Sequence, residues 1–272
     1  MNSIAQRQQA DCGGFPLSWR EAGQGHAVIL LHGISSGSAS WHKQLQDCAL
    51  SQHYRLIAWD APGYGSSAPL TSPQPTAADY AQALAALINQ LQLERPIIVG
   101  HSLGALIGSA FAASYPQQLA GLILADPAQG YGSASAEKRQ QVYQQRQQLI
   151  ETLGPQGYAE QRATALLRPG AEAADIDWVR SGMANLNPQG FLAAAWMLAN
   201  DDIYHYLQHC RTALQVWCGR QDSITPPEQA ELLAQRVQVS LRLIEAAGHA
   251  SYLDAAPQFN RYLQDFIRER LS

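Results

Sequence analysis

Short runs of apolar residues, separated by turn residues, recur along the first half of the chain. Each run ends close to a Gly, Pro or Asp and is too short for a helix, so it predicts a buried strand. The runs are residues 27–31, 55–59, 96–100 and 119–125. Between them, residues 79–93 and 105–114 have the apolar spacing or the small apolar composition of helices. This alternation predicts an α/β fold, with a mostly parallel sheet flanked by helices.

The pattern changes in the middle of the chain. Residues 127–211 contain no convincing strand pattern, and their polar helical stretches are broken by Gly and Pro. Strand-like runs return at residues 214–218 and 240–244, and an amphipathic helix is predicted for residues 257–271. Neither flank of the middle segment resembles a flexible linker. We therefore predict an α/β core made of residues 1–126 and 212–272, with a helical cap inserted as residues 127–211.

Composition and charge narrow the expected partners to a small-molecule substrate. The chain of 272 residues has a net charge of −4 and scattered basic residues, whereas nucleic-acid binding needs a concentrated basic face. Its apolar runs fall far short of the about 20 residues that cross a bilayer, so we expect no membrane partner. The polar N-terminus lacks a secretory signal, and the four cysteines form no CxxC pattern, which predicts a cytoplasmic protein with reduced thiols. A homo-oligomer stays possible.

The motif with the clearest chemistry is Gly100-His101-Ser102-Leu103-Gly104, a G-x-S-x-G sequence. It lies between a predicted strand and a predicted helix, the setting of a nucleophile elbow. Small glycines allow a strained turn there, and the turn raises the serine hydroxyl above the sheet. The simpler alternative is a glycine-rich turn with a capping serine. We predict that Ser102 is a nucleophile.

A serine hydroxyl needs a base to take its proton, and His249 is the best placed candidate. It follows the last predicted strand and precedes the final helix. His101 is adjacent to Ser102, but we expect it to pack beneath the turn. The base in turn needs a carboxylate to orient it. Asp222, which also follows a predicted strand, is preferred over its rival Asp126, and the order Ser, Asp, His is the one expected for this architecture.

Acyl transfer also requires backbone N–H groups that face the developing oxyanion. Leu103, directly after the predicted nucleophile, supplies one donor. The second is expected from the loop after the first predicted strand, where we choose Ile34. Ser35 or Ser36 could add a hydroxyl. An ordinary βα turn containing a glycine is the alternative interpretation of this loop.

Together these motifs resemble the α/β-hydrolase family. The matching pieces lie at residues 31–33, 60–66, 100–104, 219–222 and 248–249, in the order typical of the family, and the resemblance extends over about residues 15–272. It implies Ser102 as nucleophile, His249 as base and Asp222 as acid. It also implies a helical cap over the site and no metal or organic cofactor. A serine at the elbow argues against the haloalkane dehalogenases and epoxide hydrolases, which use Asp there.

Two groups within the family look most similar. One contains enol-lactonases and small-ester hydrolases of aromatic catabolism, and the residues around His249 resemble this group. The other contains meta-cleavage product hydrolases, which cleave a carbon–carbon bond in a vinylogous diketone. Those enzymes usually have Trp after the histidine, where this chain has Ala250. We therefore predict hydrolysis of a small carboxylic ester or enol-lactone, with carbon–carbon hydrolysis as the alternative.

Residues that bind the substrate are harder to choose from the sequence. Trp41, beside the oxyanion loop, and Trp196, in the cap, could line an apolar pocket. Arg180 and Arg168 could each bind a substrate carboxylate through two hydrogen bonds. Aromatic residues of a cap more often form its own core, and a lone arginine more often lies on the surface.

Overall fold

A computed structural model describes residues 5–208 and 210–271. Within these residues, eight strands form one sheet in the order β1-β2-β4-β3-β5-β6-β7-β8. The strands from β3 onward pair in parallel, whereas β1 and β2 pair antiparallel with each other and β2 pairs antiparallel with β4. The strands are β1 (Arg7–Cys12), β2 (Phe15–Ala22), β3 (His26–Leu31), β4 (Tyr54–Asp60), β5 (Ile97–His101), β6 (Gly121–Ala125), β7 (Leu214–Gly219) and β8 (Leu241–Ile244).

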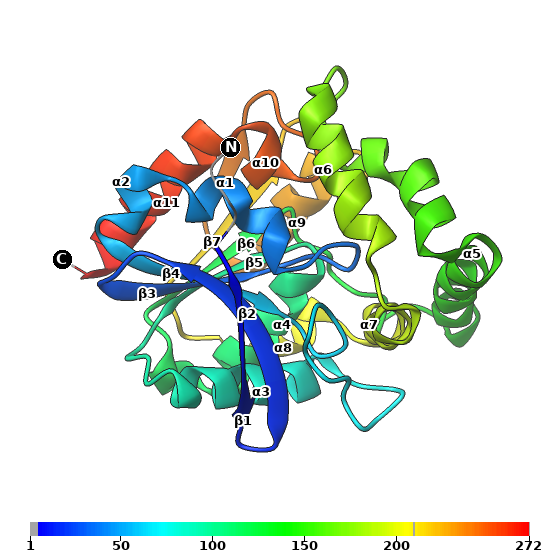
Figure 1. Ribbon diagram of the computed structural model, residues 1–272, viewed down its shortest axis with the longest axis horizontal. Helices are drawn as coiled ribbons and strands as arrows, with labels where there is room; N and C mark the ends of the chain where they lie inside the picture. The colour runs from blue at the N-terminus through cyan, green and yellow to red at the C-terminus, as the bar shows by residue number, and fades with distance from the viewer. Residues whose placement is uncertain (1–4, 209, 272) are drawn as a thin grey trace.

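Helices cover both faces of this sheet. In Figure 1, α1, α2, α10 and α11 lie on one side of the sheet, and α3, α4 and α8 lie on the other. The α-helices are α1 (His42–Leu45), α2 (Cys48–Ser51), α3 (Ala77–Gln90), α4 (Leu103–Ser114), α5 (Ala136–Arg162), α6 (Ala173–Ala184), α7 (Pro188–Asn200), α8 (Ile203–Leu207), α9 (Pro227–Val237), α10 (Ser251–Asp254) and α11 (Ala256–Leu271). Three 3₁₀ helices complete the described part: η1 (Ser38–Trp41), η2 (Pro116–Gln118) and η3 (Ala163–Leu166).

The central strands supply the core. Every residue of β5 and β6 is buried, as expected for parallel strands covered on both faces. These strands therefore form a rigid base for whatever the loops at their carboxyl ends carry.

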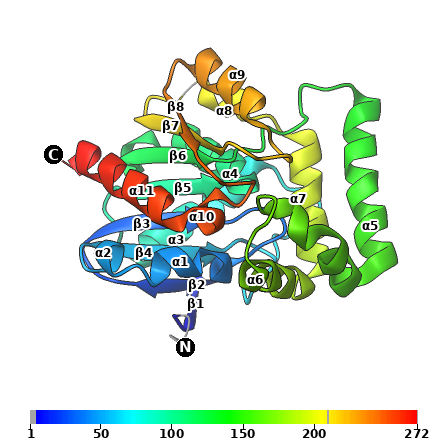
Figure 2. The ribbon, with the colours of Figure 1, turned by 90° about the horizontal axis from the view of Figure 1, so that it is seen from above.

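The helices of the middle segment do not all lie together. Figures 1 and 2 show α5, α6 and α7 beyond one end of the sheet, whereas α8 lies close to α4. Helix α5 is bent at Gly154, whose backbone is not helical (φ 63°, ψ 175°), and Pro155 follows it. A proline lacks the N–H of the helical ladder, and the bend turns the two parts of α5 in different directions.

Candidate active site

Ser102 occupies a sharp turn between β5 and α4. Its backbone has φ 52° and ψ −114°, a conformation that residues with a side chain seldom adopt. The flanking glycines make the turn possible: a Cβ at Gly100 would lie 2.3 Å from the Gly104 carbonyl oxygen, and one at Gly104 would lie 2.5 Å from the Leu31 carbonyl oxygen. The Ser102 N–H donates to the Ala125 carbonyl at 2.9 Å, which fixes the turn to the end of β6.

His249 and Asp222 form a buried pair on the loops after β8 and β7. The Nδ1–H of His249 donates to Oδ2 of Asp222 at 2.8 Å. Thr225 Oγ1 donates to the same carboxylate oxygen at 2.8 Å, and its N–H donates to Oδ1 at 3.0 Å. Burial acts to raise the pKa of Asp222, but the hydrogen bond and charge of His249 and the bonds from Thr225 outweigh it, so the pKa lies below its usual value. Asp222 thus stays ionised and orients the imidazole.

Ser102 and His249 line the same pocket of about 440 Å³, at the carboxyl ends of the strands. Among the described residues, the Ser102 hydroxyl forms no hydrogen bond with the imidazole. A base of this kind need not contact its nucleophile before substrate binds, because such contacts commonly tighten in the substrate complex.

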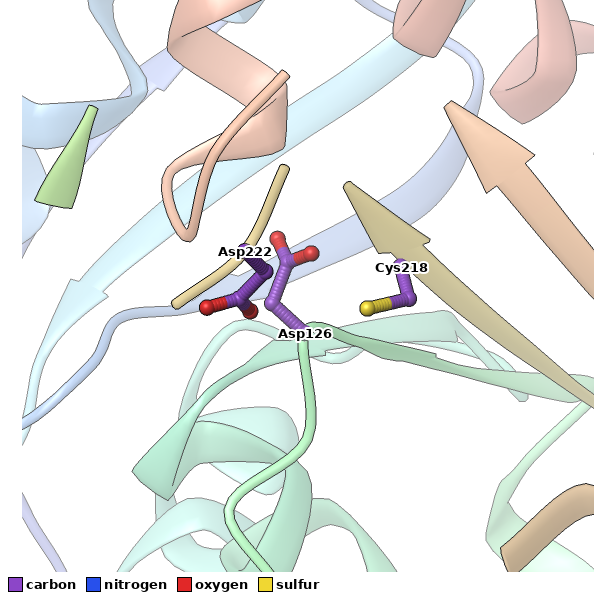
Figure 3. A group of neighbouring side chains, drawn as sticks. All are labelled: Asp126, Cys218 and Asp222. Carbon is purple, nitrogen blue, oxygen red and sulfur yellow. The ribbon is translucent and has the colours of Figure 1, made fainter. Parts of the chain in front are cut away.

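A second carboxylate, Asp126, lies beside Asp222 and Cys218 (Figure 3). It accepts hydrogen bonds from the Gly219 N–H at 2.8 Å and the Ser251 hydroxyl at 2.6 Å. Burial, and then the neighbouring charge of Asp222, raise the pKa of Asp126. The His249 ring therefore receives its carboxylate contact from Asp222, and Asp126 connects the ends of β6 and β7 with the start of α10.

The same cluster has the composition of a metal site, with three ligand atoms within 4.8 Å of one another. However, the Cys218 thiol donates to the carbonyl oxygens of Gly219 and Thr225, and burial followed by the charges of both carboxylates raises its pKa. A protonated thiol is a poor metal ligand. The hydrogen bonds already described account for the arrangement.

His101 lies beneath the turn and contacts the base through its backbone. Its Nε2–H donates to the His249 carbonyl oxygen at 2.8 Å. Complete burial, together with the nearby His249, lowers the pKa of His101 to about 3, so the ring is neutral. His101 thus supports the backbone of His249 with a neutral ring.

The loop after β3 lies against Ser102, because a Cβ at Gly33 would lie 3.2 Å from the Ser102 Cβ. Ile34 lines the pocket, and the Tyr64 hydroxyl donates to its carbonyl oxygen at 2.8 Å. The neighbouring Ser35 hydroxyl and the Tyr158 hydroxyl of α5 are 2.7 Å apart. The Leu103 N–H begins α4, where helix donors have no partner within the helix.

The three residues chosen from the sequence to bind substrate lie elsewhere, so those predictions are corrected. Trp41 is fully buried and stacks on Tyr252 with 4.2 Å between ring centroids, because η1 turns it into the core. Trp196 lines a separate cleft between α5 and α7. Arg180, on α6, forms ion pairs with Asp177 and Glu160.

Other residues line the pocket, among them two arginines that the sequence analysis did not select. Tyr131 comes from the chain before α5, whereas Arg146, Tyr158 and Arg162 lie on α5 itself. The two arginines occur in a Gln-rich helix with little hydrophobic periodicity, so its orientation could not be read from the sequence. Only the bent path of α5 shows that both reach the pocket.

The end of η3 and the residues after it are joined by hydrogen bonds to the loop that carries His249. The Ala250 N–H donates to the Leu166 carbonyl at 2.7 Å. One oxygen of Asp254 accepts from the N–H groups of both Arg168, at 2.7 Å, and Gly248, at 2.8 Å. We call this junction the seam. It connects the middle segment directly to the loop that carries the base.

None of the described helices combines the length and the apolar character needed to cross a membrane.

Comparison with known proteins gives matches that extend over nearly the whole chain. A family profile described as alpha/beta hydrolase fold matches residues 26–256. The chain is 26% identical to 2-hydroxy-6-oxo-6-phenylhexa-2,4-dienoate hydrolase of Comamonas testosteroni, covering 99% of this chain and 97% of that protein.

Two solved structures illustrate the similarity in fold. A thermophilic esterase from Thermogutta terrifontis matches with a TM-score of 0.87 and 27% identity, over 98% of this chain and 100% of that one. An enol-lactonase from Burkholderia xenovorans LB400 matches with a TM-score of 0.83 and 22% identity, over 96% and 100%. At that identity the second match supports the fold alone.

Proposed function

Because this chain belongs to the α/β-hydrolase family, we propose that it is a serine hydrolase of small carboxylic esters or enol-lactones. The observation that carries the proposal is the hydrogen-bonded pair of His249 and Asp222 in the pocket that also contains Ser102. A strained serine, an imidazole hydrogen-bonded to a carboxylate and a nearby loop of backbone donors are the groups that acyl transfer needs.

The reaction proceeds in two steps. Ser102 Oγ attacks the carbonyl carbon while Nε2 of His249 takes its proton, and the N–H groups of Ile34 and Leu103 stabilise the oxyanion. Collapse of the tetrahedral intermediate breaks the bond to the leaving group, which receives the proton from His249. Water then attacks the acyl-enzyme with His249 again as base. The bond between the acyl carbon and Ser102 Oγ breaks, His249 returns the proton to Ser102, and the acid leaves. Asp222 stabilises the imidazolium in both steps, and no metal or organic cofactor takes part.

The pocket and the thiols support further parts of the proposal. A volume of about 440 Å³ suits a small substrate. The four cysteines are free in the described residues, which is consistent with a reducing compartment such as the cytoplasm.

A second candidate is carbon–carbon hydrolysis of a vinylogous diketone on the same three residues. It is favoured by the similarity, over 99% of the chain, to the hydrolase from Comamonas testosteroni. The two candidates share the nucleophile and base and differ in the bond that breaks.

Hydrolysis of 4-nitrophenyl acetate, butyrate and octanoate tests the proposal. We expect the wild type to release nitrophenolate from the shorter esters, and Ser102→Ala to release none while its circular dichroism is unchanged. Equal release by both proteins would contradict the mechanism. If the wild type cleaves only a coloured ring-cleavage dienone, the second candidate is correct.

The same assay distinguishes the two buried carboxylates. Asp222→Asn removes the acceptor that orients His249, so we expect kcat to fall by about a thousandfold or more. Asp126→Asn leaves the Asp222–His249 pair intact, and we expect a much smaller loss. A larger loss for Asp126→Asn would reverse the assignment of the acid.

A further inference from the structure

The side chains that line the pocket at Ser102 carry an excess of positive charge. Arg146 and Arg162 both line it, whereas no Asp or Glu among the described residues does. The pocket therefore contains two positive charges in a chain whose net charge is −4. A low-dielectric cleft lined by one sign of charge attracts ligands of the opposite sign.

Neither arginine has a carboxylate partner within the described chain. The Arg146 guanidinium donates a hydrogen bond from Nη1 to the Val142 carbonyl oxygen at 3.0 Å. By contrast, Arg180 pairs with two carboxylates and Arg220 with Glu245. Both pocket arginines are half-buried, and burial lowers the pKa of Arg146, with Arg162 acting in the same direction. Two partly desolvated cations near each other are unfavourable unless an anion joins them.

Along α5, the two arginines flank both the bend and the residue that contacts the active-site loop. Arg146 precedes Gly154, and Arg162 ends the helix. Between them, the Tyr158 hydroxyl contacts the Ser35 hydroxyl at 2.7 Å. The Tyr158 contact thus joins α5 to the loop that also carries Ile34, and both arginines line the pocket that contains Ser102.

We propose that Arg146 and Arg162 bind a carboxylate of the substrate, so that the preferred substrates are half-esters or lactones of dicarboxylic acids. This inference rests on the serine-hydrolase function proposed above. Guanidinium groups bind carboxylates through parallel charge-assisted hydrogen bonds. The amides of Gln145 and Gln229, which line the same pocket, are further donors for the anionic end. The Arg180 suggested by the sequence is already neutralised by its own partners.

Paired substrates that differ only in charge test the inference. We compare 4-nitrophenyl hydrogen glutarate with 4-nitrophenyl valerate, whose acyl chains are equally long. At low salt we expect kcat/KM for the anionic ester to exceed that for the neutral one by about tenfold or more. Arg146→Gln and Arg162→Gln should each lower kcat/KM for the anionic ester by about tenfold and leave kcat/KM for the neutral ester unchanged. Added salt should reduce the preference.

Arg139→Gln is the matched control, because Arg139 also lies on α5 but faces the separate cleft with Trp196. We expect it to leave both rates unchanged. If the wild type cleaves both esters equally through Ser102, the inference is wrong and the serine-hydrolase proposal stands.

If neither ester is cleaved, the proposed function fails, and calorimetric titration tests the anion site by itself. Glutarate should bind the wild type, whereas the uncharged glutaramide should not. Arg146→Gln should lose the binding. Equal binding, or no binding of either compound, would overturn the inference.

Discussion

His101 is a buried histidine that contributes to the stability of the fold in its neutral form. Its Nε2–H supports the His249 carbonyl, and its ring packs against Tyr252 with 4.8 Å between centroids. The nearest carboxylate oxygen, on Asp126, is 3.8 Å from Nε2. Desolvation still dominates, and it is the main reason that the pKa of the ring falls to about 3. The folded state thus excludes a proton that the unfolded chain accepts.

This difference predicts how stability depends on pH. The unfolded His101 has a pKa of about 6.5 and the folded one about 3, so its contribution is complete above pH 6.5 and is lost as pH falls toward 3. Within that window His101 adds up to about 1.4 kcal/mol per pH unit to the slope of unfolding free energy. Urea unfolding between pH 4 and 7 should show a flatter dependence of the unfolding free energy on pH for His101→Gln than for the wild type. Parallel curves for wild type and His101→Gln would exclude the explanation.

Among the elements, α7 packs Phe191 and Met197 into the core and also brings its backbone against the turn after β4. A Cβ added at Gly190 would lie 2.0 Å from the Gly63 carbonyl oxygen, in the turn after β4. Gly63 itself has φ 84°. Two glycines are therefore needed for this approach, and the position of α7 depends on their lack of side chains.

Alanine substitutions at two helical glycines should have opposite effects. Gly190→Ala forces α7 away from the turn, and we expect a loss of about 2 kcal/mol of unfolding free energy. Gly182→Ala, on α6, meets nothing within 4 Å and should stabilise the protein by about 0.5–1 kcal/mol through helix propensity. Denaturant unfolding measures both. A tolerated Gly190→Ala would mean that α7 does not depend on this contact.

The sequence predicted the elements best where burial is strongest. Strands β3 to β8 lie within two residues of the predicted runs, because these strands are mostly apolar. The β1–β2 hairpin was missed because β1 is largely exposed and polar. Its only local signal was Gly13-Gly14, a two-residue turn with φ values of 62° and 91°.

The residues of the candidate site also fall into those whose positions could be predicted from the sequence and those whose positions could not. Ser102, Asp222 and His249 follow strands, so the sheet brings them together, and their positions could be predicted although their roles stay proposals. The direction of a side chain within a loop or cap depends on packing that lies far away in the sequence. Trp41 was therefore misplaced, and Arg146 and Arg162 were not selected.

At the scale of the whole molecule, the seam joins parts of the chain that are distant in sequence. Asp254 holds the N–H groups of Arg168 and Gly248 with one oxygen, next to the hydrogen bond between Ala250 and Leu166. A Cβ at Gly248 would lie 2.6 Å from the Leu167 carbonyl carbon. The loop that carries His249 and the middle segment thus pack together as one unit.

Asp254→Ala should affect stability and catalysis together. It leaves two N–H groups without their acceptor, so we expect a loss of about 1–3 kcal/mol and a lower kcat, because His249 lies one residue from Gly248. Asp265→Ala is the control, since its recorded ion pair joins it to the exposed Arg268. Thermal unfolding and ester hydrolysis measure the two effects. A stability loss with unchanged kcat would show that the seam does not position the base.

The seam also predicts which segments must be exchanged together when chimaeras are made with related proteins. A cap transplanted as residues 127–211 alone would bring foreign backbone to positions 166–168 and remove the fit to Gly248 and Asp254. We expect functional chimaeras only when residues 248–254 are exchanged together with the cap. We therefore expect the boundary for successful recombination to follow the hydrogen bonds of the loop that carries His249, and not the limits of residues 127–211.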